Sequence, residues 1–152
     1  MAMEPAKPAR AFAGACHCGA IEFVFHSSQG PRLWTIRACQ CRFCRRHGAR
    51  TTADASGYVT FRLNDESRLQ RYRFGLQSAE FLICRRCGVY IAAVLTSPRG
   101  RFATININAI REPLDVAEAI PVSYEGETLE VRQQRREQRW TPVIEADDPA
   151  PG

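Results

Sequence analysis

The chain has 152 residues, of which seven are cysteines, and its formal net charge at pH 7 is +5. This length is typical of one domain with its own hydrophobic core. Because seven is odd, a fully paired set of intrachain disulfides is excluded. Residues 1–10 carry no apolar signal region, and the longest apolar run, residues 89–95, is far shorter than the roughly 20 residues of a membrane helix. We therefore expect a soluble cytoplasmic protein, in which clustered thiols bind metal or perform redox chemistry more often than they form disulfides.

Residues 1–11 contain two prolines and are expected to form a disordered lead. Residues 12–124 form the candidate domain. Within it, short alternating or β-branched segments are separated by glycine and proline turns, which is typical of strands. The predicted strands are residues 20–25, 33–38, 58–62, 69–74, 80–84, 89–96 and 102–107. These short strands predict a mainly β domain.

Residues 125–152 form a C-terminal tail of different composition. Residues 126–140 predict a polar helix in which arginines and glutamates interleave, and we interpret it as solvated and salt-bridged. Its arginines are Arg132, Arg135, Arg136 and Arg139. Trp140, Val143 and Ile144 are expected to fold back onto the domain, and residues 147–152 to be disordered.

The positive charge comes almost entirely from arginine, since Lys7 is the only lysine. No acid lies between Glu22 and Asp54, whereas six arginines do: Arg32, Arg37, Arg42, Arg45, Arg46 and Arg50. Arginine forms planar, bidentate contacts with carboxylate and phosphate. The stretch therefore fits a basic site for an anionic small molecule, a contact with nucleic acid, or a simple offset of the negative charge that thiolates bring to a bound zinc.

Three short motifs contain all seven cysteines. They are Cys-x-Cys at residues 16–18, Cys-x-Cys-x-x-Cys at residues 39–44 and Cys-x-x-Cys at residues 84–87. Such spacings place two or three sulfurs around one small sphere, and zinc binds four ligands tetrahedrally. Gly19 and Gly88 follow two of the motifs, where glycine lets the backbone turn toward the sulfurs. The motifs therefore predict bound zinc.

The count suggests a division into four thiols and three. The two shorter motifs would form a closed structural zinc site from Cys16, Cys18, Cys84 and Cys87. The longer motif would hold a second zinc with an exchangeable fourth position, the pattern of catalytic sites, from Cys39, Cys41 and Cys44. The spacing does not force this partition.

Histidines are the alternative ligands. His47 lies one helical turn after Cys44 and could close the three-cysteine site as its fourth ligand. The other interpretation, which we prefer, is a solvent-facing histidine or one just outside the ligand set. His17 and His26 are weaker candidates.

The cysteine motifs resemble those of the glutathione-dependent formaldehyde-activating enzyme family, which shares its domain with centromere protein V. The matching stretches are GACHCG at residues 14–19, CQCRFCR at 39–45 and FLICRRCG at 81–88. The resemblance covers residues 12–124 and implies the Mss4-like fold, in which antiparallel β-sheets surround zinc. It also implies a structural zinc at the four-cysteine set and a functional zinc at the three-cysteine set. The implied activity is that of a carbon–sulfur lyase, which condenses formaldehyde with glutathione to S-hydroxymethylglutathione. The tail from Gly126 departs from the family pattern.

A mechanism follows as a hypothesis. Zinc at the three-cysteine site would bind and deprotonate the glutathione sulfur, or would act as a Lewis acid on water or the aldehyde oxygen; the sequence leaves both open. Arg42, Arg45 and Arg46 are expected to hold the carboxylates of glutathione. No general base stands out, and His47 is only a candidate.

Two other functions fit parts of the sequence. A non-catalytic zinc module that contacts nucleic acid or protein fits the positive charge, but the glutamates of the tail nearly cancel its arginines, so nucleic acid is disfavoured. Thiol redox chemistry at Cys84 and Cys87 lacks the expected βαβ context. The predicted partners are therefore a small-molecule thiol and an aldehyde, with no membrane.

The remaining side chains receive structural interpretations. Five aromatic residues are expected in the core or half-buried on the sheets: Trp34, Phe61, Tyr72, Phe81 and Tyr90. Asn106 and Asn108 alternate on a strand and could lie at the surface or face a pocket; we prefer the surface. Thr51 and Thr52 could line the three-cysteine site.

Overall fold

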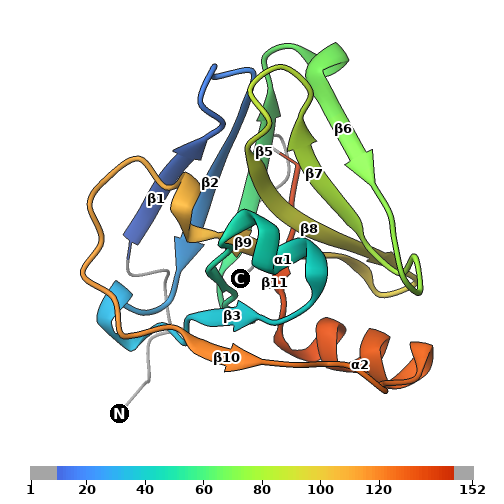
Figure 1. The fold of residues 1–152 in the computed structure, drawn as a ribbon. Helices are drawn as coiled ribbons and strands as arrows, with labels where there is room; N and C mark the ends of the chain where they lie inside the picture. Colours follow the sequence, from blue (N-terminus) through green and yellow to red (C-terminus); the bar gives the residue numbers. More distant parts are fainter. Residues whose placement is uncertain (1–9, 146–152) are drawn as a thin grey trace.

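Two β-sheets form the framework of the protein (Figure 1). The computed structural model describes residues 10–145. The smaller sheet is antiparallel and has the order β1-β2-β5, with β1 at Arg10–Ala15, β2 at Ile21–Ser27 and β5 at Tyr58–Leu63. The mainly β fold that the sequence predicts is confirmed, since 40% of the described residues are in strands and 19% are in helices, 3-10 turns included.

The larger sheet is antiparallel except at one edge, where β10 and β3 run parallel. Strand β11 lies off its main path and pairs with β9. In spatial order the strands are β10 (Ile120–Val122), β3 (Arg37–Cys39), β4 (Thr51–Thr52), β9 (Gly100–Asn106), β8 (Tyr90–Ser97), β7 (Glu80–Cys84) and β6 (Leu69–Tyr72), with β11 at Thr141–Pro142.

Two α-helices lie outside the sheets, with α2 beside β10 at the lower edge of Figure 1. Helix α1 spans Arg42–His47 and ends at Gly48, whose φ of 56° is the left-handed conformation that favours glycine. Helix α2 spans Leu129–Arg139 and begins where the Thr128 hydroxyl accepts a hydrogen bond from the Val131 amide. Single 3-10 turns lie at Pro31–Leu33, Glu66–Arg68 and Ile107–Ala109.

The main core lies between the two sheets. Strand β2 alternates as its sequence predicts, with Ile21, Phe23 and Phe25 buried. These side chains belong to one apolar cluster with Ile91 of β8 and Ile105 of β9. Strand β8 is buried over Tyr90–Leu95, which explains its unbroken apolar sequence.

Six of the seven predicted strand segments contain a strand, but the prediction for residues 33–38 is wrong over most of its length. The chain makes a 3-10 turn at Pro31–Leu33 and pairs only from Arg37. Before that point Trp34 and Ile36 fill the core without forming a strand, whereas Leu33 is exposed. The Trp34 ring packs edge-on against Phe12, with 4.8 Å between ring centroids, and its indole nitrogen donates to Ser27 Oγ at 2.9 Å.

The predicted tail helix is confirmed by α2, and the chain after it does fold back. Trp140 is buried, and Val143 bridges to Val59 of β5. Strand β1 begins at Arg10, inside the expected lead, whereas residues 1–9 and the predicted disordered end at 147–152 lie outside the described residues. Strand β1 was not predicted from the sequence, and neither were α1 and the strands β4, β10 and β11, of which these last four are too short to show a period.

Gly57 tests how tightly the smaller sheet is closed. A Cβ added at Gly57 would collide with the backbone carbonyl of His26, which cannot move without disturbing β2. We expect Gly57→Ala to lower the free energy of unfolding by about 1–3 kcal/mol, measured by denaturant titration. Gly30→Ala is the matched control, because its Cβ would meet nothing within 4 Å, and it should change stability by less than about 0.5 kcal/mol. Equal stability of the two variants would contradict this account.

Candidate active site

The seven thiols gather into two groups. The sulfurs of Cys16, Cys18, Cys84 and Cys87 all lie within 4.8 Å of one another, and so do those of Cys39, Cys41 and Cys44. The structure therefore brings together the same four and three residues that the sequence count grouped. Neither group of ligand atoms contains a histidine or a carboxylate among the described residues.

The four-thiol group joins two hairpin turns from different sheets. Cys16 and Cys18 lie between β1 and β2, and Cys84 and Cys87 lie at the turn from β7 to β8. The Cys18 sulfur lies 3.7 Å from that of Cys16 and 3.5 Å from that of Cys84. Sulfurs on a tetrahedral zinc with 2.3 Å bonds are separated by about 3.8 Å. The donor set and its spacing therefore fit a closed zinc site.

The three-thiol group comes from one continuous stretch. Cys39 ends β3, Cys41 is the N-cap of α1, and Cys44 lies in the first turn of α1. The Cys41 sulfur accepts a hydrogen bond from the Cys44 amide at 3.3 Å, so the start of the helix fixes the distance between two of the thiols. This donor set also suits zinc but supplies only three ligands.

His47 does not join the three-thiol group. Its side chain is exposed, and its ring packs on Phe43 with 4.5 Å between ring centroids. His17 is also exposed, and His26 stacks on Tyr58. The structure thus agrees with the interpretation in which His47 lies outside the ligand set.

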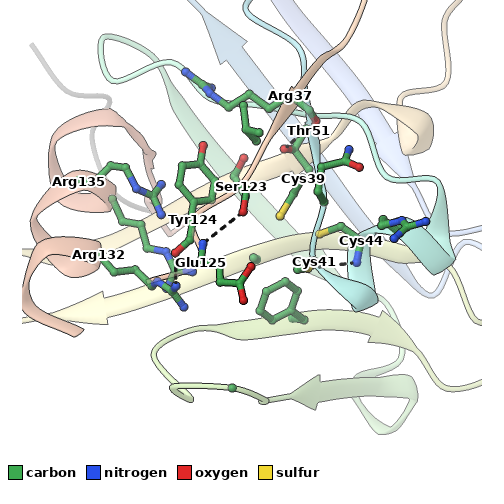
Figure 2. A pocket seen from close by; sticks show the side chains of 18 of the residues that line it. Arg37, Cys39, Cys41, Cys44, Thr51, Ser123, Tyr124, Glu125, Arg132 and Arg135 are labelled. Atoms are coloured by element: carbon green, nitrogen blue, oxygen red, sulfur yellow. Dashed lines mark hydrogen bonds between the residues drawn. The ribbon is translucent and has the colours of Figure 1, made fainter. Parts of the chain in front are cut away.

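A cavity of about 560 Å³ opens beside the three thiols (Figure 2). Strand β3 and helix α1 form one side of it, and the chain from Val122 to Glu125 together with α2 forms the facing side. Phe74, Phe81 and Tyr90 supply an apolar wall. The fourth side of the three-thiol group therefore faces a space large enough for a small molecule.

Seven arginines line this cavity, against one acid among the lining residues, Glu125. They are Arg37, Arg42, Arg45, Arg132, Arg135, Arg136 and Arg139. Of the three arginines predicted for substrate binding, Arg42 and Arg45 line the cavity. Arg46 does not; it lines a separate shallow site with Arg42 and Arg45 and donates to the Arg42 carbonyl.

The contribution of α2 to the cavity wall was not predicted from the sequence. Its four arginines follow the spacing i, i+3, i+4, i+7, so they share one face of the helix. That spacing is visible in the sequence and could have identified the face as functional. The interpretation of this helix as a solvated, salt-bridged one is wrong for that face, because all four residues line the cavity.

Glutamate 127 holds two of these arginines in place. Its carboxylate accepts from Arg135 Nε at 2.8 Å and Nη2 at 3.0 Å, and from Arg132 Nε at 3.2 Å. The Arg135 guanidinium also stacks on the Tyr124 ring, 3.6 Å from its centroid. All three charged side chains are at most 18% exposed, so solvent screens them little. The salt-bridge part of the interpretation is therefore right.

Electrostatics favour a thiolate in the three-thiol group. Hydrogen bonding with Cys44 is the main cause that lowers the pKa of Cys39 to about 6, and the charge of Arg135 adds to the effect. The shared proton raises the pKa of Cys44. Burial lowers the pKa of Arg136 to about 10, which still leaves it protonated at neutral pH. The site thus combines a thiolate with cations that stabilise negative charge.

The prediction that five aromatic residues are buried or half-buried is confirmed for four of them and is wrong for Tyr72. Trp34 and Tyr90 are buried, Phe61 and Phe81 are half-buried, and Tyr72 is exposed. Tyr90 and Phe81 also line the cavity, as does Thr51.

The prediction that Asn106 lies at the surface is wrong. Asn106 is buried, and its side-chain amide donates to the Tyr90 carbonyl at 2.9 Å, which ties β9 to the start of β8 beside the cavity. A buried amide is tolerated there because its hydrogen bond is satisfied. Asn108 is exposed, as predicted.

The pairing with Glu127 makes the position of α2 sensitive to acid. The hydrogen bonds from Arg135 lower the pKa of Glu127 below its ordinary 4.5, so the stabilisation is present at neutral pH and is lost as the pH falls through that depressed value. We expect Glu127→Gln to lower the free energy of unfolding by about 1–2 kcal/mol at pH 7, and by less below pH 4, in denaturant titrations. Glu118→Gln, at an exposed position outside the helix, is the control and should have no such effect. A pH-independent loss in Glu127→Gln would contradict this assignment.

The chain is similar in sequence to known proteins. A solved structure of a Rhodobacter sphaeroides protein is 26% identical to this chain, with a match that covers 72% of this chain and 99% of that one at a TM-score of 0.49. Among residues 10–145, no helix is long and apolar enough to cross a membrane. The family model for the glutathione-dependent formaldehyde-activating enzyme matches residues 11–125. Since this match spans most of the chain and includes all seven cysteines, the protein belongs to the glutathione-dependent formaldehyde-activating enzyme family.

Proposed function

We propose that this protein adds the thiol of glutathione to formaldehyde, or to a related aldehyde, and so acts as a carbon–sulfur lyase of the S-hydroxymethylglutathione synthase type. The observation that carries the proposal is the group of three thiols in the wall of an arginine-lined cavity. Family membership supports glutathione-dependent formaldehyde activation in general. The arrangement supports the finer statement, because an incomplete ligand set beside a cavity is the pattern of catalytic metal sites.

Two zinc ions per chain are part of the proposal. Cys16, Cys18, Cys84 and Cys87 would hold a structural ion, since four thiols complete a tetrahedral site. Cys39, Cys41 and Cys44 would hold the second ion, which would supply a Lewis acid that lowers the pKa of a thiol in the cavity.

The side chains around the cavity would position the reactants. Arg42 and Arg45 would bind a carboxylate of glutathione, because a guanidinium matches carboxylate geometry. The apolar wall of Phe74, Phe81 and Tyr90 would limit water around the sulfur and strengthen these charged contacts. Positioning the thiol beside the aldehyde is itself a large part of such a rate acceleration.

The proposed reaction is balanced without an oxidant or reductant. The sulfur attacks the carbonyl carbon, a carbon–sulfur bond forms, and the π electrons of the carbonyl move to its oxygen. The proton lost by the thiol ends on that oxygen, which gives the hemithioacetal.

The rival function, a non-catalytic module for nucleic acid or protein, has no comparable support among the described residues. The four tail arginines line the cavity, and two of them pair with Glu127, which supports a role at the cavity. The cytoplasmic location and the expected absence of nucleic acid as a partner stay predictions.

The three-thiol assignment is tested with Cys41→Ser. Serine can still cap α1, because its hydroxyl can accept the hydrogen bond that the Cys41 sulfur receives from the Cys44 amide. We expect the zinc content, measured by elemental analysis, to fall from two ions to one per chain, and hemithioacetal formation to fall by about a hundredfold or more. His47→Gln is the control for zinc content and should keep two ions. Retention of both ions and full activity in Cys41→Ser would overturn the proposal.

The four-thiol assignment is tested with Cys18→Ser. Cys18 is exposed, so its replacement removes a ligand with little loss of packing. Because binding a structural zinc contributes directly to folding, we expect a stability loss of about 3 kcal/mol or more and one zinc fewer per chain. The neighbouring exposed His17→Gln should match the wild type. A chelator should destabilise the wild type more than Cys18→Ser; equal sensitivity would argue against a structural ion at these thiols.

A further inference from the structure

Arg136 is a buried cation that no acid neutralises within residues 10–145. Its side chain is 92% buried, since its exposed fraction is 8%. One terminal nitrogen, Nη1, donates to Ser78 Oγ at 2.7 Å, and the guanidinium lies 4.7 Å from the Trp140 ring centroid. Its Nε is buried and has no hydrogen-bond partner. It is unfavourable to bury a charge without a counter-charge, or a hydrogen-bond donor without an acceptor. An anion bound next to Arg136 would therefore be stabilised.

Glu127, the neighbouring acid, is not available to form an ion pair with Arg136. Glu127 is already paired with Arg132 and Arg135 through both of its oxygens. Burial is the main cause that lowers the pKa of Arg136, those two arginines add to the effect, and the charge of Glu127 offsets it only in part. The local balance on α2 therefore stays positive.

Arg136 also lies in the wall of the cavity that contains the three thiols. Figure 2 shows Arg132 and Arg135 of α2 on one side of this cavity and Cys41 and Cys44 of α1 on the other. Arg42 and Arg45 line it from α1. Two separate groups of arginines, one from each helix, thus face the space beside the thiols.

We propose that Arg136 binds a carboxylate of the thiol co-substrate, and that the cavity therefore selects thiols with two carboxylates, one for the arginines of α1 and one for Arg136. This inference rests on the proposed function, since it concerns the co-substrate of the same site. Because Nε itself is closed to solvent, a carboxylate in the cavity would meet the terminal edge of the guanidinium, where the two terminal nitrogens can bind it in a bidentate way. Helix α2 lies beyond residue 125, where the family match ends, so this selectivity belongs to the C-terminal segment of this chain.

Binding is measured with S-methylglutathione, which keeps both carboxylates but has no free thiol to react. Isothermal titration calorimetry on the full chain compares the wild type with Arg136→Gln, and we expect Arg136→Gln to bind it roughly tenfold more weakly or worse. Arg136→Lys should lie between them, because lysine restores the charge without the bidentate edge. Arg111→Gln, which removes an exposed arginine outside the cavity, is the matched control and should bind as the wild type does.

The dimethyl ester of S-methylglutathione separates carboxylate recognition from damage to the fold. Without carboxylates, it should bind the wild type and Arg136→Gln with equal affinity, so the effect of the substitution should disappear. If Arg136→Gln weakens the diacid and the diester equally, Arg136 has only a structural role and the inference is overturned. It is also overturned if Arg136→Gln binds the diacid as tightly as the wild type does.

Failure of the carboxylate site and failure of the proposed reaction give different experimental results. If the wild type forms no hemithioacetal but binds S-methylglutathione in an Arg136-dependent way, the reaction assignment fails while the carboxylate site is supported. If the wild type forms hemithioacetal and Arg136→Gln binds S-methylglutathione normally, the reaction stands and the carboxylate site is overturned.

Discussion

The four-thiol group lies at the junction where a hairpin of the smaller sheet meets a hairpin of the larger one. Cys18 and Cys84 are 66 residues apart in the chain, yet their sulfurs lie 3.5 Å from each other. One belongs to the hairpin of the smaller sheet and the other to a hairpin of the larger sheet. The apolar cluster between the sheets brings these turns together. A zinc ion bound there, as proposed, would cross-link a long segment of chain and so restrict the unfolded chain strongly. Such a cross-link would also fix how the two sheets are placed relative to one another at this end.

The three-thiol group, unlike the four-thiol group, is assembled from one short segment of the chain. Its members come from six consecutive residues, 39–44, so a strand end and the first turn of a helix are enough to gather them. What the remaining fold adds is the space on the fourth side. The buried Tyr90, held through its carbonyl by Asn106, and the rings of Phe74 and Phe81 shape that space into an apolar wall. A local motif therefore provides the thiols, and distant strands decide that they face a cavity.

Charge in the cavity is organised by the C-terminal helix. Glu127 fixes two arginines of α2 and partly neutralises them, while Arg136 stays buried and unpaired by any acid within the described part of the chain. The cation–π contact of Arg135 with Tyr124 joins the helix to the segment before it. These contacts make the tail part of the cavity wall. The cost of a buried, uncompensated cation is the physical reason to look for an anionic ligand there.

The sequence by itself predicted the mainly β class, the polar helix after residue 126, and the division of seven cysteines into four and three, although the spacing did not force that division. These features depend on local alternation and on short spacings between like residues, which survive without a fold. The sequence did not determine the extended path of Trp34, the burial of Asn106, or the face of α2 that turns inward. Each of these depends on contacts between segments far apart in the chain: Trp34 with Ser27 and Phe12, Asn106 with Tyr90, and Arg136 with Ser78. Only the tertiary structure decided that the arginines of this polar helix line the cavity beside the three thiols. The reason is that Trp140 packs against the larger sheet and so sets how α2 is rotated about its axis.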